Sequence, residues 1–214
     1  MWPSIFWGLV DLLAPPRCLS CWVELEPGGH GFCRPCNELL EPTQGSEAAL
    51  AAYFYVGPIA QAVKALKFEG RSEVAPFLAR LICPFIQSLR LNVDAIVPVP
   101  LHQERLRERG YDQVGLIARA LARLLRIPVH HSALVRTRPT EAQSKLGREA
   151  RLENVKGAFA LHHNFNAKGG RFLLLDDVRT TGATISEAEK ALREGGALFV
   201  HGFAVAITPK DLSV

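Results

Sequence analysis

Two adjacent carboxylates follow a short apolar run in the last quarter of the chain. Residues 172–175 are Phe-Leu-Leu-Leu, and Asp176 and Asp177 come directly after them. Such a run is typical of a buried strand, in which neighbouring side chains point to opposite faces. Ionised carboxylates accept hydrogen bonds, so a pair of them at a strand end could hold two vicinal hydroxyls, as on a ribose.

Three threonines and a glycine continue this polar stretch where a helix is expected to begin. They are Thr180, Thr181, Gly182 and Thr184. A helix amino terminus presents unpaired N–H groups and partial positive charge, glycine lets a ligand approach the backbone closely, and hydroxyls add donors. Together with the carboxylates, this combination describes a site for a ribose 5-phosphate. A turn with a threonine cap would explain Asp177 and Thr181, but not the whole set.

Four of the five cysteines form a pattern that is typical of a metal site. Two C-x2-C pairs are separated by eleven residues, and their members are Cys18, Cys21, Cys33 and Cys36. Four thiolates complete the tetrahedron of a structural zinc ion and leave no open position for catalysis. Disulfides are the alternative chemistry, but without a secretory signal we expect a reducing compartment. Cys83 lies in an apolar helical stretch and is expected to be a buried small side chain.

Length and composition exclude several classes of protein. The 214 residues suffice for one full domain and a small appendage. Hydrophobic residues make up 48% and charged residues 21%, and the glycines and prolines follow no repeat, so disordered and collagen-like chains are excluded. Positive charge is concentrated in residues 102–151, which hold 11 Lys/Arg against 5 Asp/Glu. Such a segment favours a surface that faces phosphates, of a small ligand or of nucleic acid, although a solvated helix face would explain Arg119, Arg123 and Arg126.

The apolar start of the chain is too short to span a membrane. Residues 1–14 include Asp11, whereas a spanning helix needs about 20 apolar residues. The stretch also lacks the basic segment and the small-residue cleavage site of a signal peptide. We expect a short amphipathic helix, no stable membrane insertion and a cytoplasmic location, with contact to a membrane surface as the alternative.

Hydrophobic periodicity predicts alternating strands and helices after a polar linker at residues 41–47. Strands are expected at 53–56, 95–99, 171–175 and 198–207, and helices at 58–68, 73–89, 114–125 and 182–194. A long loop is expected at 137–154, and long loops in compact domains are usually functional. Strands that alternate with helices predict an α/β fold with a parallel sheet and a ligand at the carboxyl ends of its strands.

Residues 176–184 resemble the motif by which type I phosphoribosyltransferases bind 5-phosphoribosyl-1-pyrophosphate (PRPP), an acidic pair followed by T-T-G-x-T. More of the chain, from about residue 9 to its end, resembles the ComF/GntX family. Besides the cysteine pairs, this resemblance rests on Asp94, Pro98, Pro100, His102, Arg105, Arg109, Gly110, Tyr111, Gln113, Arg138, Gln143, Leu146, Arg151, Asn154, Gly157 and Phe159. It implies a type I phosphoribosyltransferase-like domain at 48–214, preceded at 1–47 by the amino-terminal helix, the zinc module and the linker.

The resemblance also implies roles for single residues. PRPP with Mg²⁺ would bind at Asp176, Asp177, Val178, Arg179, Thr180, Thr181, Gly182, Ala183 and Thr184, and at Val99 and Pro100, which are placed like a pyrophosphate loop. Arg138 and Lys145 lie where type I enzymes keep a catalytic lid. Candidates for phosphate or DNA contacts are Arg105, Arg109, Tyr111, Gln113 and Arg148.

Two functions from different classes follow from the resemblance. One is a role in DNA uptake or handling during natural transformation (competence), with PRPP, single-stranded DNA and proteins of the competence machinery as partners. The other is a PRPP-dependent phosphoribosyltransferase of nucleotide metabolism with an unidentified acceptor. Two departures bear on the choice: Thr180 stands where purine-type enzymes carry an acidic residue, and Asp112 stands where the family motif R-G-[YF]-N-Q has asparagine. Turnover of PRPP is therefore left open.

Overall fold

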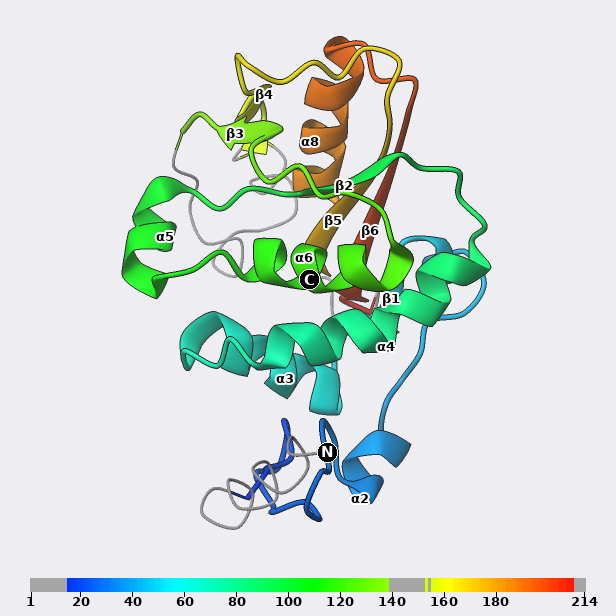
Figure 1. The fold of residues 1–214 in the computed structure, drawn as a ribbon, viewed down its shortest axis with the longest axis vertical. Helices are drawn as coiled ribbons and strands as arrows, with labels where there is room; N and C mark the ends of the chain where they lie inside the picture. Colours follow the sequence, from blue (N-terminus) through cyan, green and yellow to red (C-terminus); the bar gives the residue numbers. More distant parts are fainter. Residues whose placement is uncertain (1–14, 139–152, 154, 210–214) are drawn as a thin grey trace, which may run out of the picture.

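The computed structural model describes residues 15–138, 153 and 155–209, and its centre is a four-stranded parallel sheet. The strands are β1 (Ala51–Phe54), β2 (Ala95–Pro98), β5 (Arg171–Arg179) and β6 (Phe199–Ile207), in the order β1-β6-β5-β2 (Figure 1). Every neighbouring pair is parallel. The expected α/β fold with a parallel sheet flanked by helices is confirmed.

Helices cover both faces of the sheet, because its strands are apolar on both sides. On one face lie α3 (Gly57–Phe68), α4 (Val74–Ser88) and α6 (Gln113–Leu125), and on the other lies α8 (Ala183–Glu194) (Figure 1). Strand β5 serves both cores: Leu173 and Leu175 pack with the first group, and Phe172 and Leu174 pack with α8. This alternation buries residues 172–175 of β5 on both faces. The strand continues to Arg179, beyond the expected end at residue 175, so Asp176 and Asp177 lie within its carboxyl-terminal half.

Local signals explain where the helices beside the site begin and end. The carboxylate of Asp112 accepts a hydrogen bond of 3.1 Å from the Val114 N–H and so caps α6. Gly182 precedes α8 with φ of 83°, a left-handed conformation that glycine adopts without strain, and Gly195 follows that helix. These boundaries agree with the expected ones to within one or two residues.

The shortest elements escaped sequence prediction. They are α2 (Arg34–Glu38), a 3-10 turn (Glu47–Ala49), α5 (Gln103–Arg109) and the antiparallel pair β3 (Leu134–Arg136) and β4 (Phe159–Leu161). Elements of three to seven residues do not show a hydrophobic period that can be recognised. The expected linker is also partly ordered: the Thr43 hydroxyl donates to the Ala51 carbonyl at 2.6 Å, and the Thr43 N–H donates to the Ala52 carbonyl at 3.0 Å.

The cysteine-bearing segment packs against α4. The rings of Phe32 and Phe77 meet edge to face with centroids 5.2 Å apart, and Leu19 belongs to the core of the helical layer. Residues 1–14, where an amphipathic helix is expected, lie outside the described residues. Among the described residues, no helix has both the length and the apolar character needed to cross a bilayer.

Replacing Gly31 by alanine tests this packing. Gly31 has φ of 95°, and a Cβ there would lie 1.8 Å from the Phe77 ring; Gly28 has φ of 79° and open space around it. Both Gly31→Ala and Gly28→Ala incur a left-handed backbone penalty of about 1–2 kcal/mol, but only Gly31→Ala must also displace Phe77, for about 1–3 kcal/mol more. Denaturant unfolding measures the difference. Equal losses in the two variants would contradict the packing described.

Candidate functional site

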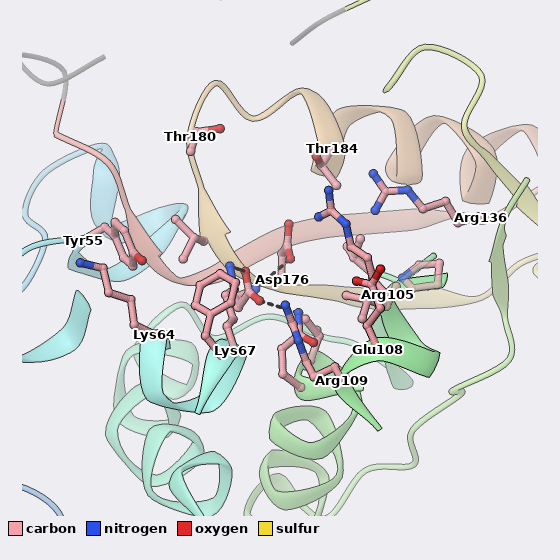
Figure 2. A pocket seen from close by; sticks show the side chains of 18 of the residues that line it. Tyr55, Lys64, Lys67, Arg105, Glu108, Arg109, Arg136, Asp176, Thr180 and Thr184 are labelled. Atoms are coloured by element: carbon pink, nitrogen blue, oxygen red, sulfur yellow. Dashed lines mark hydrogen bonds and ion pairs between the residues drawn. The ribbon is translucent and has the colours of Figure 1, made fainter. Parts of the chain in front are cut away.

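A large cavity of about 1250 Å³ opens at the carboxyl ends of β2 and β5. Figure 2 shows side chains from β5, from α3 and from α5 turned toward it, and the residues that directly follow β2 also line it. The lining residues are Tyr55, Lys64, Lys67, Phe68, Glu69, Gly70, Val99, Pro100, Leu101, Arg105, Glu108, Arg109, Gln113, Val114, Arg136, Asp176, Asp177, Val178, Thr180 and Thr184. The large cavity therefore lies at the carboxyl ends of the strands, where the sequence predicts the ligand.

Asp177 is a buried carboxylate that is held from two helices. Lys67 of α3 places its Nζ 2.7 Å from Oδ1, and Gln113 of α6 donates from Nε2 to Oδ2 at 2.9 Å. The Asp177 side chain is 7% exposed and that of Lys67 is 20% exposed, so the ion pair is largely shielded from water. Each carboxylate oxygen can accept about two hydrogen bonds, which leaves capacity for ligand hydroxyls.

Asp176 differs from its neighbour, because no lysine or glutamine contact of this kind holds it. Its Oδ1 accepts a hydrogen bond of 2.8 Å from the Asp177 N–H. Burial, together with the charge of Asp177, raises the pKa of Asp176 from 3.8 to about 7. The two carboxylates thus have different electrostatic roles: Asp177 is matched by a cation, and Asp176 can hold a proton near neutral pH.

The segment after the carboxylates forms a turn at the start of α8. Thr180 and Thr184 line the cavity, as does Val178. The Thr181 hydroxyl accepts a hydrogen bond of 3.3 Å from the Ala183 N–H. The Arg179 guanidinium lies against Gly182 so closely that a Cβ at Gly182 would be 2.7 Å from its Nη2. The turn therefore combines N–H groups, hydroxyls and a close guanidinium, which are groups that bind phosphate.

A basic group of residues borders the carboxylates on another side. Arg105 and Arg136 line the cavity with Val99 and Pro100 (Figure 2). Burial, and next the charge of Arg105, lower the pKa of Arg136 to about 10, while the charge of Asp176 opposes this shift. Sequence reasoning did not single out Arg136. It lies in the basic segment 102–151, but β3 is too short for a hydrophobic pattern to predict which way its side chains point.

Arg109 lies in the cavity wall beside an aromatic ring. Its guanidinium carbon is 5.5 Å from the centre of the Phe68 ring. Burial lowers the pKa of Arg109, although Asp177 opposes the shift. Among the described residues, Nη1 of Arg109 and Oε1 of Gln113 are buried in the cavity wall and find no hydrogen-bond partner. Buried polar atoms without partners are rare, and here they border a cavity that a polar ligand could fill.

The other residues expected at the site have different surroundings. The Tyr111 hydroxyl donates to the Leu66 carbonyl at 2.5 Å, which ties the residues before α6 to α3. Arg138 donates from Nη2 to the carbonyls of Glu153 and Lys156, at 3.3 and 2.7 Å, and is not among the residues that line the cavity. The expected lid residue Lys145 and the expected phosphate contact Arg148 lie outside the described residues.

The four cysteines of the C-x2-C pairs come together in the segment that packs against α4. Their Sγ atoms all lie within 4.8 Å of one another, and all four thiols are free. Sγ of Cys18 accepts a hydrogen bond of 3.3 Å from the Cys33 N–H, and the Sγ atoms of Cys21 and Cys33 are 3.6 Å apart. Thiolates around a tetrahedral zinc with bonds of about 2.3 Å would be separated by about 3.8 Å, so this cluster could hold a metal ion.

Comparisons with known proteins agree on one family. The chain is 32% identical over 196 residues to the DNA utilization protein YhgH of Escherichia coli K12, which covers 89% of this chain and 84% of that one. It is 30% identical to Competence protein F of Haemophilus influenzae, with the same two coverages, and 29% identical to Competence protein ComFC of Bacillus subtilis, with 90% and 85%. No protein-family profile matches the chain.

Solved structures give a weaker likeness. A glutamine PRPP amidotransferase from B. subtilis, in complex with ADP and GMP, aligns with 76% of this chain and 31% of its own, at 18% identity and a TM-score of 0.39. A phosphoribosyltransferase from Corynebacterium diphtheriae aligns with 79% of this chain and 100% of its own, at 17% identity and a TM-score of 0.36. Family membership instead follows from sequence identity along most of the chain: this protein belongs to the ComF family.

Proposed function

We propose that this ComF-family protein binds PRPP with Mg²⁺ in the cavity and acts in the handling of DNA during natural transformation. The observation that supports PRPP as the ligand is the set of groups that line one cavity: the turn at residues 180–184, two carboxylates and two arginines. The names of its relatives, DNA utilization protein and competence proteins, support the cellular role. The cytoplasm fits the proposal, because the four free thiols need a reducing compartment.

Each part of PRPP has a counterpart among the residues of the cavity. The 5-phosphate would bind to the turn at 180–184, and the ribose hydroxyls would donate to Asp176 and Asp177. The pyrophosphate would face Arg105 and Arg136 next to the loop at Val99. When bound, Mg²⁺ would neutralise part of the pyrophosphate charge. Turnover, if present, would transfer the phosphoribosyl group to an acceptor and release pyrophosphate, which is the signature of a phosphoribosyltransferase.

The first prediction concerns Asp177. In the Asp177→Asn variant, the carboxylate that accepts ribose hydroxyls is lost, so we expect PRPP affinity to fall at least about 100-fold, since hydrogen bonds to charged groups contribute about 1.5–3 kcal/mol each. Isothermal titration of PRPP with Mg²⁺ measures the change, with pyrophosphate release followed in parallel. Because Lys67 would lose its partner, the double variant Lys67→Met/Asp177→Asn, which removes both charges, checks that any loss is not unfolding. Unchanged affinity in folded variants would refute the ribose contacts.

A second prediction follows from the raised pKa of Asp176. The unfolded chain releases this proton near pH 3.8 and the folded protein near pH 7. Between these values the folded state binds more protons, so this carboxyl makes the free energy of unfolding fall as pH rises. Asp176→Asn should therefore be more stable than the wild type above about pH 7, with the advantage shrinking toward about pH 4. Denaturant unfolding across this range measures it, and parallel curves for the two proteins would contradict the prediction.

We further propose that the four-cysteine cluster binds zinc in a structural role. Its four thiolates satisfy the coordination of zinc and leave no position for a substrate. The segment carrying the cluster is small: within it, Cys18 and Leu19 are buried, while Trp22 and Val23 are exposed. Such a segment has little core of its own, so metal binding would supply folding free energy that apolar burial does not.

The third prediction tests this role of zinc. Cys33→Ser should release the zinc ion and lower stability, because metal binding in small zinc modules contributes on the order of 10 kcal/mol to folding. Zinc content by mass spectrometry under native conditions and thermal unfolding measure the two effects. Cys83→Ala is the matched control, since Cys83 lies in the helical core and not in the cluster. A zinc-free wild type of full stability would refute the structural role.

A further inference from the structure

The cavity has an aromatic side that the proposed PRPP contacts do not use. This aromatic side consists of Tyr55, Lys64 and Phe68, which line the cavity together with the carboxylates. In the view of Figure 2, Tyr55 and Lys64 lie to one side of Asp176, whereas Arg105 and Arg136 lie to the other. The phosphate turn, the carboxylates and the two arginines are enough to hold a phosphorylated ribose with its pyrophosphate. The aromatic side is therefore available for another group.

Phe68 is the most unusual residue of this side. Its exposed fraction is 74%, the largest among the exposed large hydrophobic residues of the described chain. It is the last residue of α3 and directly follows Lys67, whose Nζ is 2.7 Å from Asp177. The ion pair thus sets the position of the ring relative to the carboxylates. An exposed phenyl ring at the cavity provides a flat apolar surface for a ligand.

Arg109 gives the Phe68 ring a cationic neighbour. The guanidinium lies over the ring at 5.5 Å, and its buried Nη1 finds no hydrogen-bond partner among the described residues. A planar group stacked on Phe68 would meet an apolar surface, and an acceptor atom on its edge could receive the free N–H of Arg109. Nucleobases combine a flat π-face with acceptor atoms on the edge, which is the combination that this pair of side chains fits.

Tyr55 links the aromatic side to the ribose site. It follows β1, and its N–H donates to the Ile207 carbonyl of β6 at 2.8 Å, which holds it at the carboxyl end of the sheet. Burial raises the pKa of Tyr55, and the charges of Lys67 and Asp177 act on it in opposite directions, so its hydroxyl lies near this ion pair. A base on Phe68 would therefore lie beside the sugar site and not on a separate surface.

Charge around the aromatic side favours a base that is still attached to a nucleic acid strand. A free base carries no charge, whereas Lys64 and Arg109 line this side of the cavity, together with one carboxylate, Glu69. Arg71 does not line the cavity and is paired with Glu73 at 2.9 Å. Arg71, three residues after Phe68, lies 3.9 Å from the centre of the Trp22 ring, and Trp22 is 45% exposed. A second aromatic ring with a stacked guanidinium thus follows the first, as in proteins that bind single strands by alternating base stacking and phosphate contacts.

We propose that Phe68 is a stacking platform for an unpaired base of single-stranded nucleic acid, seated in the cavity beside the PRPP site. This proposal rests on the proposed role in DNA handling and gives it a site. It adds to that role a residue, Phe68, that contacts the strand, and a ligand chemistry, an unpaired base. It also places the bound strand next to the PRPP site.

Fluorescence titration of the full-length, zinc-loaded protein tests the platform. The probe is a single-stranded oligonucleotide of about 12 nucleotides that contains 2-aminopurine, whose emission falls when it stacks. A second probe has the same phosphates but abasic sugars, so it reports charge without stacking. The variants are Phe68→Ala, Phe68→Tyr, which keeps the ring, and Leu198→Ala, which removes a 66% exposed side chain outside the cavity.

The proposal predicts a base-dependent loss. Phe68→Ala should weaken binding of the base-containing strand by about 5- to 150-fold, the range for one lost stacking contact, and should abolish the quenching. Phe68→Tyr and Leu198→Ala should bind like the wild type, and the abasic strand should bind more weakly than the normal one. Equal binding of the two strands, or equal affinities of Phe68→Ala and Leu198→Ala, would overturn the proposal.

Two further measurements separate this proposal from the proposed function. Titration of the wild type with PRPP and Mg²⁺ tests the ligand of the sugar site, and its failure would refute PRPP binding without affecting the Phe68 comparison. Titration with free adenine and thymine tests the source of the base. Binding of free bases that depends on Phe68, without such dependence for the strand, would overturn the assignment of a strand.

Discussion

The buried ion pair between Lys67 and Asp177 is the interaction on which the rest of the site depends. It joins the end of β5 to the end of α3, and Gln113 adds α6 through the second carboxylate oxygen. A buried carboxylate without a partner would be strongly destabilising, so the contacts from α3 and α6 compensate for the burial of Asp177 at this point. The meeting of these three elements places the turn at residues 180–184 after β5 and the Phe68 ring after Lys67 around one cavity.

Asp176, the other carboxylate of the site, lowers the stability of the folded protein when it is ionised. Asp176 is half-buried beside a like charge, and its pKa near 7 means that ionising it in the folded protein is unfavourable below that pH. Replacing such a group commonly stabilises a protein and removes its function. Burial has the opposite effect on Arg136, because it disfavours the charged guanidinium and lowers its pKa to about 10. A ligand that carries hydroxyls and phosphates would satisfy both groups at once.

Sequence patterns predicted those parts of the molecule in which one residue type repeats or a local motif is sufficient. The strands 171–175 and 198–207, the helix that begins after Gly182 and the cluster of four cysteines all follow from local patterns, and the structure contains them. The carboxylates were predicted to lie at a strand end and the threonines at the start of the following helix; Asp176, Asp177, Thr180 and Thr184 line the cavity. Their roles toward PRPP stay a proposal.

Residues that reach the site from distant elements could not be predicted in this way. Lys67 was not predicted to belong to the site, because nothing local in the sequence connects it to Asp177, 110 positions later. Arg136 comes from a three-residue strand, and Tyr55 and Phe68 come from element ends where no pattern indicates direction. The measurement that tests the account most directly is a crystal structure of the protein with PRPP and Mg²⁺. The account predicts the 5-phosphate at residues 180–184 and the ribose hydroxyls on Asp176 and Asp177, with Lys67 still paired to Asp177; PRPP bound elsewhere, or with its hydroxyls away from this pair, would contradict it.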